Sequence, residues 1–95
     1  MPSYPGTLKC VAAYSPRRPL KELIGQALTG RLGAEDVRYL FGRVFLIYTQ
    51  ADTSTVRDWL TPLIEEDESL FVTEFERWSG FGPAPDRDWL RERGH

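Results

Sequence analysis

The sequence has few of the residues on which nucleophilic catalysis and covalent cross-linking depend. It contains one cysteine, Cys10, and one histidine, His95, which is the last residue. A single cysteine forms no disulfide within the chain, and the apolar segment around Cys10 predicts a reduced thiol in the core. Catalysis by Cys10 would need a histidine beside it, and a terminal residue is a poor partner because chain ends fray. The sequence also lacks a cofactor-binding motif and a catalytic constellation, so we expect no cofactor and no metal.

Long hydrophobic runs are also missing. No segment approaches the ~20 apolar residues that a membrane span requires, and residues 1–7 lack the features of a signal peptide. The composition, with 41% hydrophobic and 27% charged residues, is that of an ordinary globular protein. We therefore expect a cytoplasmic protein without membrane contact. At 95 residues, it should form a single domain over 1–95, with an irregular lead-in over 1–6 and a C-terminal tail over 77–95.

The charges are nearly balanced overall but unevenly distributed. The net charge of −2 excludes the global basic field that supports non-specific binding to nucleic acid. Basic residues nevertheless outnumber acidic ones up to Tyr48, and acidic residues dominate beyond it. A basic edge that holds phosphate or nucleic acid is one interpretation, and exposed loop charges without a ligand are the other. The candidate residues for this edge are Lys9, Arg17, Arg18 and Arg38.

Three segments have the pattern of strands that are buried on both faces. Arg43 to Gln50 is apolar at both parities, with Val44, Leu46 and Tyr48 alternating against Phe45 and Ile47. Residues 7–14 and 69–76 show the same two-sided pattern. A fourth strand over 35–41 has one more polar face, and a turn centred on 41–43 should join it to the strand that follows as a hairpin.

Two amphipathic helices are expected between these strands. In the first, Pro19 suits the first helical position, and Gly30 and Gly33 provide stop signals. In the second, Asp52 is the predicted N-cap, and Pro62 predicts a kink or break near Leu60. A short final helix should begin at Asp86 and contain Trp89 and Leu90.

Four consecutive acids, Glu65 to Glu68, follow the second helix. Negative charge at a helix C-terminus opposes the helix dipole, which is unfavourable unless arginine side chains compensate it. A solvated corner is the simpler interpretation of these acids, and a metal site is the alternative.

The order strand, helix, strand, strand, helix, strand predicts an α+β protein with the ferredoxin-like βαββαβ arrangement. In that arrangement, two helices pack on one face of a four-stranded antiparallel sheet. The opposite face would then expose apolar residues from three strands, which is a larger patch than soluble monomers tolerate. It could be covered by a second copy of the chain, by the aromatic tail, or by single-stranded nucleic acid stacked on aromatic side chains. We prefer a second copy of the chain, with or without exchange of the tail between the partners, because the strand with glycine and alternating aromatics that RNA-recognition domains use is absent.

The segment from Val44 to Leu90 resembles a group of small bacterial proteins. It contains in succession the strand FLIYT, the capped helix DTSTVRDWL, an acidic turn, the strand SLFVTEFE, the motif WSGFG and a final WLRE. The most specific part is the motif at 78–82. These features resemble the SinR-like proteins, which are relatives of the second CRISPR-associated protein, the small ferredoxin-like subunit of the spacer-adaptation complex. The resemblance is weaker over the first strand and helix.

The resemblance implies a ferredoxin-like homodimer that associates through sheet faces and C-terminal segments. The wider superfamily includes metal-dependent nucleases in which an aspartate at the end of the first strand coordinates the divalent ion. The matching position here is Ser15. A serine hydroxyl does not replace a carboxylate as a ligand of Mg²⁺, so the resemblance does not extend to the metal site.

Our first hypothesis is a non-catalytic homodimeric interaction or scaffolding module, with aromatic and aliphatic residues as interface anchors. A tail that packs on its own sheet is the alternative role for these residues. The second hypothesis is a Mg²⁺-dependent nuclease or nucleic-acid-binding dimer that uses the basic edge. An antitoxin, inhibitor or mobile-element protein that binds a host protein is a third. The candidate anchors are Leu46, Phe75, Trp78, Phe81 and Trp89.

Overall fold

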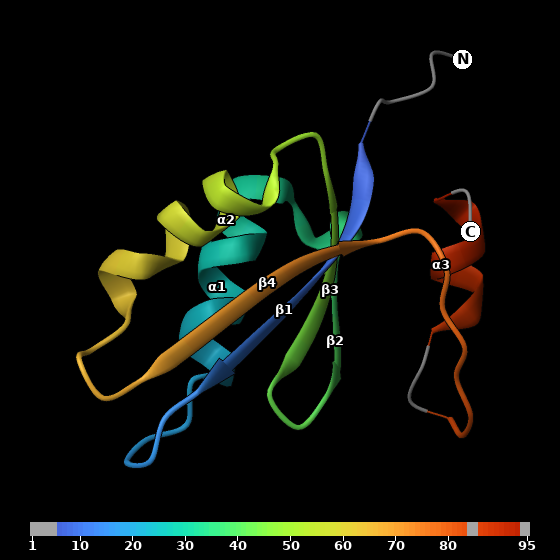
Figure 1. The fold of residues 1–95 in the computed structure, drawn as a ribbon. Coiled ribbons are helices and arrows are strands. Elements are labelled where there is room, and N and C mark those ends of the chain that lie inside the picture. Colours follow the sequence, from blue (N-terminus) through green and yellow to red (C-terminus); the bar gives the residue numbers. More distant parts are fainter. Residues whose placement is uncertain (1–5, 84–85, 94–95) are drawn as a thin grey trace.

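The computed structural model describes residues 6–83 and 86–93. His95 and most of the predicted lead-in lie outside these ranges. Two short 3₁₀ turns, Ala34–Asp36 and Thr61–Leu63, connect the regular elements. In chain order, the strands and helices are β1 (Thr7–Tyr14), α1 (Lys21–Leu32), β2 (Val37–Phe41), β3 (Val44–Thr49), α2 (Thr53–Leu60), β4 (Ser69–Phe75) and α3 (Arg87–Glu92) (Figure 1).

The four strands form one antiparallel sheet in the order β2-β3-β1-β4. On β1, Cys10 pairs with Leu46 of β3 and with Thr73 of β4. Helices α1 and α2 lie on one side of this sheet and α3 on the other (Figure 1). The predicted α+β class with a four-stranded antiparallel sheet is confirmed, and the arrangement is compatible with a ferredoxin-like fold.

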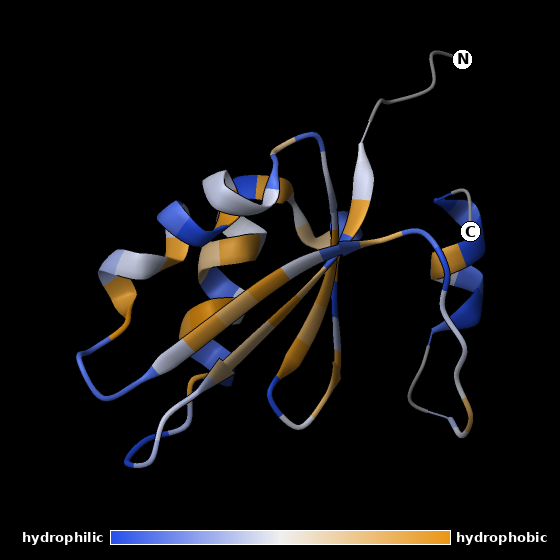
Figure 2. Ribbon diagram, in the orientation of Figure 1, coloured by the Kyte–Doolittle hydropathy of each residue, from blue (hydrophilic) through white to orange (hydrophobic). Residues whose placement is uncertain are grey.

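The face under α1 and α2, called here the helical face, contains the main core. Its buried side chains alternate along β1 and β3 with those of the opposite face, as the two-sided pattern predicted. Both helices carry hydrophobic residues (Figure 2), and those that are buried pack in one cluster with residues of the sheet. The core members are Val11, Ala13, Leu20, Ile24, Leu28, Phe45, Ile47, Val56 and Leu60.

The predicted boundaries of α1 and β2 need correction. Helix α1 begins at Lys21, with Leu20 as its N-cap, so Pro19 precedes the helix and is not its first residue. The helix also continues through Gly30 to Leu32, and its C-cap is Gly33, whose φ of 88° favours glycine. A glycine inside a helix is tolerated when tertiary packing supports the surrounding turns. The 3₁₀ turn that follows delays the start of β2 from the predicted residue 35 to Val37.

The local signals around α2 and α3 were predicted correctly. The Asp52 carboxylate accepts a hydrogen bond from the Thr55 backbone N–H, and that of Asp86 accepts one from Trp89 N–H. Helix α2 ends at Leu60 and continues as a 3₁₀ turn that contains Pro62. Proline cannot donate the backbone hydrogen bond that a continued α-helix requires.

The opposite face of the sheet, called here the second face, is partly covered by the C-terminal tail of the same chain. Trp89 and Leu90 of α3 are each 2% exposed and pack against Leu8 and Leu46. Helix α3 is mostly hydrophilic, with a few hydrophobic residues (Figure 2). The sequence left three candidates for covering this face: a second copy of the chain, the aromatic tail or single-stranded nucleic acid. In the structure, the tail covers part of it. The half-buried members of the cluster are Cys10, Leu40, Tyr48, Phe75 and Trp78.

Candidate functional site

The structure separates the four residues of the predicted basic edge. Lys9 is 1% exposed; its ammonium donates to the Thr49 carbonyl and lies 3.3 Å from a carboxylate oxygen of Glu74. Arg38, on edge strand β2, forms an ion pair with Asp86 before α3. Arg17 and Arg18 remain together in the loop after β1. The four residues therefore do not present one continuous cationic surface.

Ser15 organises the loop that contains these two arginines. Its hydroxyl oxygen accepts hydrogen bonds from the backbone N–H groups of Arg17 and Arg18, at 3.1 and 3.2 Å. Ser15 is 8% exposed, so these bonds lie mostly out of water. A serine that accepts from the backbone two and three residues further on stabilises a tight turn. Ser15, at the position expected for the nuclease aspartate, therefore stabilises the loop after β1.

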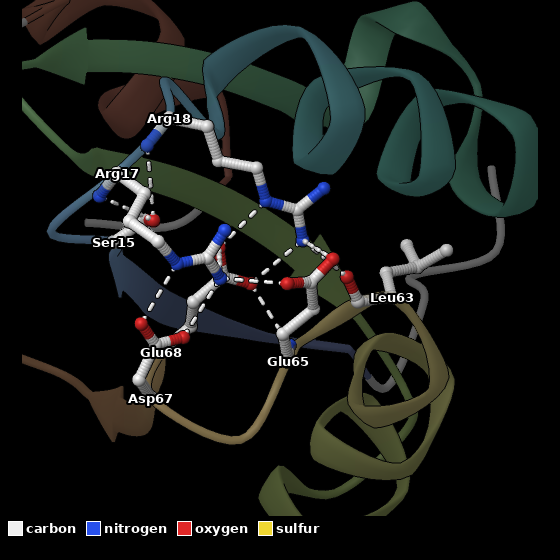
Figure 3. Close-up of polar contacts among 7 residues, drawn as sticks. All are labelled: Ser15, Arg17, Arg18, Leu63, Glu65, Asp67 and Glu68. Atoms are coloured by element: carbon white, nitrogen blue, oxygen red, sulfur yellow. Dashed lines mark hydrogen bonds and ion pairs between the residues drawn. The ribbon is translucent and has the colours of Figure 1, made fainter.

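Both arginine side chains reach the acidic segment between α2 and β4 (Figure 3). The guanidinium of Arg17 donates two hydrogen bonds to Asp67, at 2.8 and 2.7 Å, and a third to Glu65 at 2.6 Å. The two-point contact with Asp67 is the fork geometry in which arginine binds a carboxylate most strongly. We call these two arginines and Glu65, Asp67 and Glu68 the ion-pair cluster.

Glu68 is the buried member of the ion-pair cluster. Its side chain is 0% exposed, and Arg18 donates to both carboxylate oxygens at 2.6 Å. The Glu65 backbone N–H donates to the same carboxylate at 2.8 Å. Arg18 also donates to the Leu63 carbonyl, which belongs to the end of the 3₁₀ turn. The hydrogen bonds from Arg18 hold the pKa of Glu68 well below its usual range, since they favour the charged form.

The ion-pair cluster explains how the chain tolerates acids after α2. Arginine side chains compensate the negative charge there, as the dipole argument required. Carboxylate oxygens of Glu65, Asp67 and Glu68 lie within 4.8 Å of one another, a spacing that could suit a cation. However, all three already accept hydrogen bonds from guanidinium groups that would repel a metal ion. The geometry therefore favours a structural role for these acids.

A cavity of about 530 Å³ is lined by residues of the same loop, of the start of α1 and of the β2–β3 hairpin. Arg17, Arg18, Lys21 and Arg43 contribute to its lining, which includes no acidic residue. The sequence analysis missed Lys21 and Arg43, because they are distant along the chain from each other. The pairing of β1 with β3 places Arg43 beside Ala13, whose N–H donates to the Arg43 carbonyl, and Lys21 reaches the same cavity from the start of α1. The other lining residues are Ala13, Ser15, Pro16, Pro19, Leu20, Ile24, Gly42 and Phe45.

The second face has an uncovered part beyond α3, called here the open half. The strand register places Ala12 between Val44 and Phe71 on this face. Phe71 is 63% exposed, Phe41 is 53% exposed, and Tyr14 at the end of β1 is 48% exposed. The Arg43 guanidinium stacks on the Tyr14 ring at 4.9 Å. Phe41 and Phe71 lie on the two edge strands, with Val44 and Ala12 between them in the register. Exposed aromatic side chains spread over one sheet face are typical of an interaction surface.

Four of the five predicted interface anchors belong to the second-face cluster of the same chain. Leu46 and Trp89 are buried in the second-face cluster, and Phe75 and Trp78 pack against it. Only Phe81 stands apart from them, and it is 96% exposed. Its neighbour Gly82 has a φ of 96°, so the chain turns sharply beside this side chain.

Comparisons with known proteins leave these surfaces as the main guide to function. No protein-family model, curated protein or solved structure matches the chain. Within residues 6–83 and 86–93, no helix has the length and apolarity needed to cross a membrane.

The ion-pair cluster predicts a specific loss of stability in acid. The pKa of Glu68 is lower in the folded chain than its unperturbed value of 4.5, so its contribution is complete above that value and is lost as the pH falls. Glu68→Gln should lower the melting temperature at pH 7 and reduce the difference between the melting temperatures at pH 7 and pH 3. Thermal melts followed by circular dichroism would measure both effects. Glu66→Gln, on an exposed residue of the same turn, is the control, and an equal effect of both variants would contradict the assignment.

Proposed function

We propose that this protein is a non-catalytic homodimeric interaction module whose two copies associate through the open half of the second face. The observation that carries the proposal is the exposure of Phe71, Phe41 and Tyr14 on a sheet face that the chain's own tail covers only in part. Burial of such side chains contributes ~25 cal/mol per Å² of apolar surface, so their exposure in a lone chain is unfavourable.

The dimensions of α3 support this proposal. A helix of six residues is about 9 Å long, whereas the eight residues of β1 extend over about 26 Å. Helix α3 therefore cannot cover the whole length of the strands. It packs against Leu8 and Leu46, which leaves the end of β1 at Tyr14 open.

A second copy is the occupant that this geometry favours. In a two-fold dimer, each copy offers the same patch, and each tail can lie beside the other on the joined second faces. Phe81, which is 96% exposed, would then have an apolar surface to contact on the partner. Exposed aromatic residues of this kind are the usual anchors of protein interfaces.

The topology and the resemblance agree with this proposal. The order βαββαβ, with strands arranged β2-β3-β1-β4, is compatible with a ferredoxin-like fold and so supports the proposal. The resemblance to the SinR-like relatives of the CRISPR-adaptation subunit implies dimers formed through sheet faces. The Ser15 hydroxyl accepts hydrogen bonds from two backbone N–H groups of its own turn. This structural role favours a relative of the superfamily that lacks the metal-dependent nuclease activity.

Light scattering on a size-exclusion column tests the proposal. From micromolar concentration upward, the wild-type protein should have twice the mass of one chain. Phe71→Lys should give the mass of one chain, because a charged side chain would be desolvated in the interface. Phe81→Lys should weaken the dimer less, since this residue is a single contact at the margin.

Gln26→Lys is the matched control, because it adds the same charge on the exposed outer side of α1. It should remain dimeric. Circular dichroism should show that all three variants are folded. A wild-type protein that is monomeric at every concentration would overturn the proposal, and so would a dimer that Phe71→Lys leaves intact.

A further inference from the structure

We propose that the cavity between the β1–α1 loop and the β2–β3 hairpin binds a small phosphate-bearing molecule with an apolar or ring-shaped portion. The cavity borders the open half of the second face through Arg43, which stacks on Tyr14, but its lining contains none of the exposed aromatic residues of the open half. Its ligand would therefore bind whether or not the protein dimerises. The proposal is based on the lining of the cavity and on the unused hydrogen-bond donors of its cationic side chains.

The ion-pair cluster leaves one edge of each loop guanidinium available. Arg17 and Arg18 use their Nε and Nη2 atoms for the carboxylates and for the Leu63 carbonyl. Within the described residues, neither Nη1 atom donates a hydrogen bond. The acids therefore hold both guanidinium groups in place while leaving donors for a further anion. Such preorganisation lowers the entropy that binding costs.

Lys21 and Arg43 extend the cationic lining. The Lys21 ammonium lies 4.1 Å from the centre of the Tyr39 ring, and the Arg43 guanidinium lies 4.9 Å from that of Tyr14. Neither residue forms an ion pair with a carboxylate in the part of the chain that the structure describes. Ring contacts orient these cations without neutralising their charge. Both groups therefore remain able to bind an anion.

The remaining wall of the cavity is apolar. Leu20, Ile24 and Phe45 belong to the core beneath it, so this wall is rigid. A volume of about 530 Å³ is within the range of pockets that hold small organic ligands. Arginine matches the geometry of phosphate oxygens at two points. Arg17 and Arg18 are paired with the acidic turn, so Lys21 and Arg43 supply the charge that is not yet compensated. Together with the apolar wall, this charge favours a phosphorylated organic molecule over a metal ion or a neutral ligand.

Calorimetric titration with pyrophosphate and with ADP provides the test. Both should bind, ADP more tightly because its ring system can contact the apolar wall, and added salt should weaken both. Lys21→Ala combined with Arg43→Ala should weaken ADP binding about tenfold or more, because two charged contacts are lost. The control is Arg77→Ala combined with Arg91→Ala, which removes the same charge from exposed residues outside the cavity.

The outcomes separate this site from an extended nucleic-acid surface and from the dimer. Oligonucleotides that bind more tightly with length, with no binding of ADP or pyrophosphate, would overturn the proposal. Equal weakening by the two double variants would also overturn it, because only general charge would then matter. Phe71→Lys should bind ADP as the wild type does, so failure of the dimer would leave this test intact.

Discussion

Replacing Trp89 by alanine is expected to lower the free energy of unfolding by about 3–5 kcal/mol. Trp89 is 2% exposed and fills the space between α3 and the second face. Its indole Nε1 donates to the Glu35 carbonyl at 2.6 Å, and the Arg93 guanidinium stacks on the ring at 4.5 Å. Alanine would remove the packing, the hydrogen bond and the stacking together. Denaturant unfolding followed by circular dichroism, at one fixed protein concentration, would measure the loss.

Two further substitutions in the tail make this result interpretable. Trp89→Phe keeps an aromatic ring but removes the donor to Glu35, so it should cost clearly less than alanine. Phe81→Ala should change the free energy of unfolding by less than about 0.5 kcal/mol at a concentration where the protein is monomeric, since Phe81 is 96% exposed. A small effect of Trp89→Ala would mean that α3 does not stabilise its own sheet. The tail would then have to be placed on a partner.

Replacing Lys9 by alanine is expected to destabilise the fold by about 2–4 kcal/mol. Lys9 is 1% exposed on the helical face of β1, and its ammonium donates to the Thr49 carbonyl at 3.1 Å and to the Thr7 hydroxyl. Alanine would leave a void where the aliphatic stem packs and would remove the donor to a buried carbonyl. Denaturant unfolding should show the loss at pH 7.

Lys9→Met separates the two contributions. Methionine keeps the length and the apolar stem but lacks the ammonium, so it should cost less than alanine. It leaves Glu74, whose side chain is 49% exposed, accessible to water, so the loss of the ion pair adds little. If either variant weakened phosphate binding while leaving stability unchanged, the buried structural role of Lys9 would be wrong.

Much of the secondary structure could be predicted because its signals are local. Alternation of apolar residues predicted the bounds that β1 has in the structure, and Asp52 and Pro62 marked the start and end of α2. These signals act within a few residues, through the pleat of a strand, a side-chain cap or a missing N–H group. The prediction failed where neighbouring structure decides, as at Gly30, which lies inside α1.

The candidate sites were predictable only in part. The sequence indicated that arginines might compensate the acids after α2, but it did not indicate which ones. Arg17 and Arg18 lie about fifty positions from Asp67 and Glu68, and the pairing of β1 with β4 brings the two loops together. Lys9 was placed on a basic edge because its charge suggested exposure, whereas its position in β1 directs it toward the helical face. The cavity containing Lys21 and Arg43 had no continuous sequence signal.

The class of the fold follows from the sequence alone, because the period of the apolar residues specifies which segments are strands or helices and which sides they bury. The sequence also indicates that two helices cover only one face of the sheet, so that apolar residues on the other face must be buried by another segment or molecule. Three features follow from the folded arrangement and not from the sequence pattern: α3 covers part of that face, Arg17 and Arg18 pair with the acidic turn, and Lys9 is buried. Those outcomes depend on contacts between residues far apart in the chain, and hydrophobic burial and charge pairing select such contacts only once the strands are aligned.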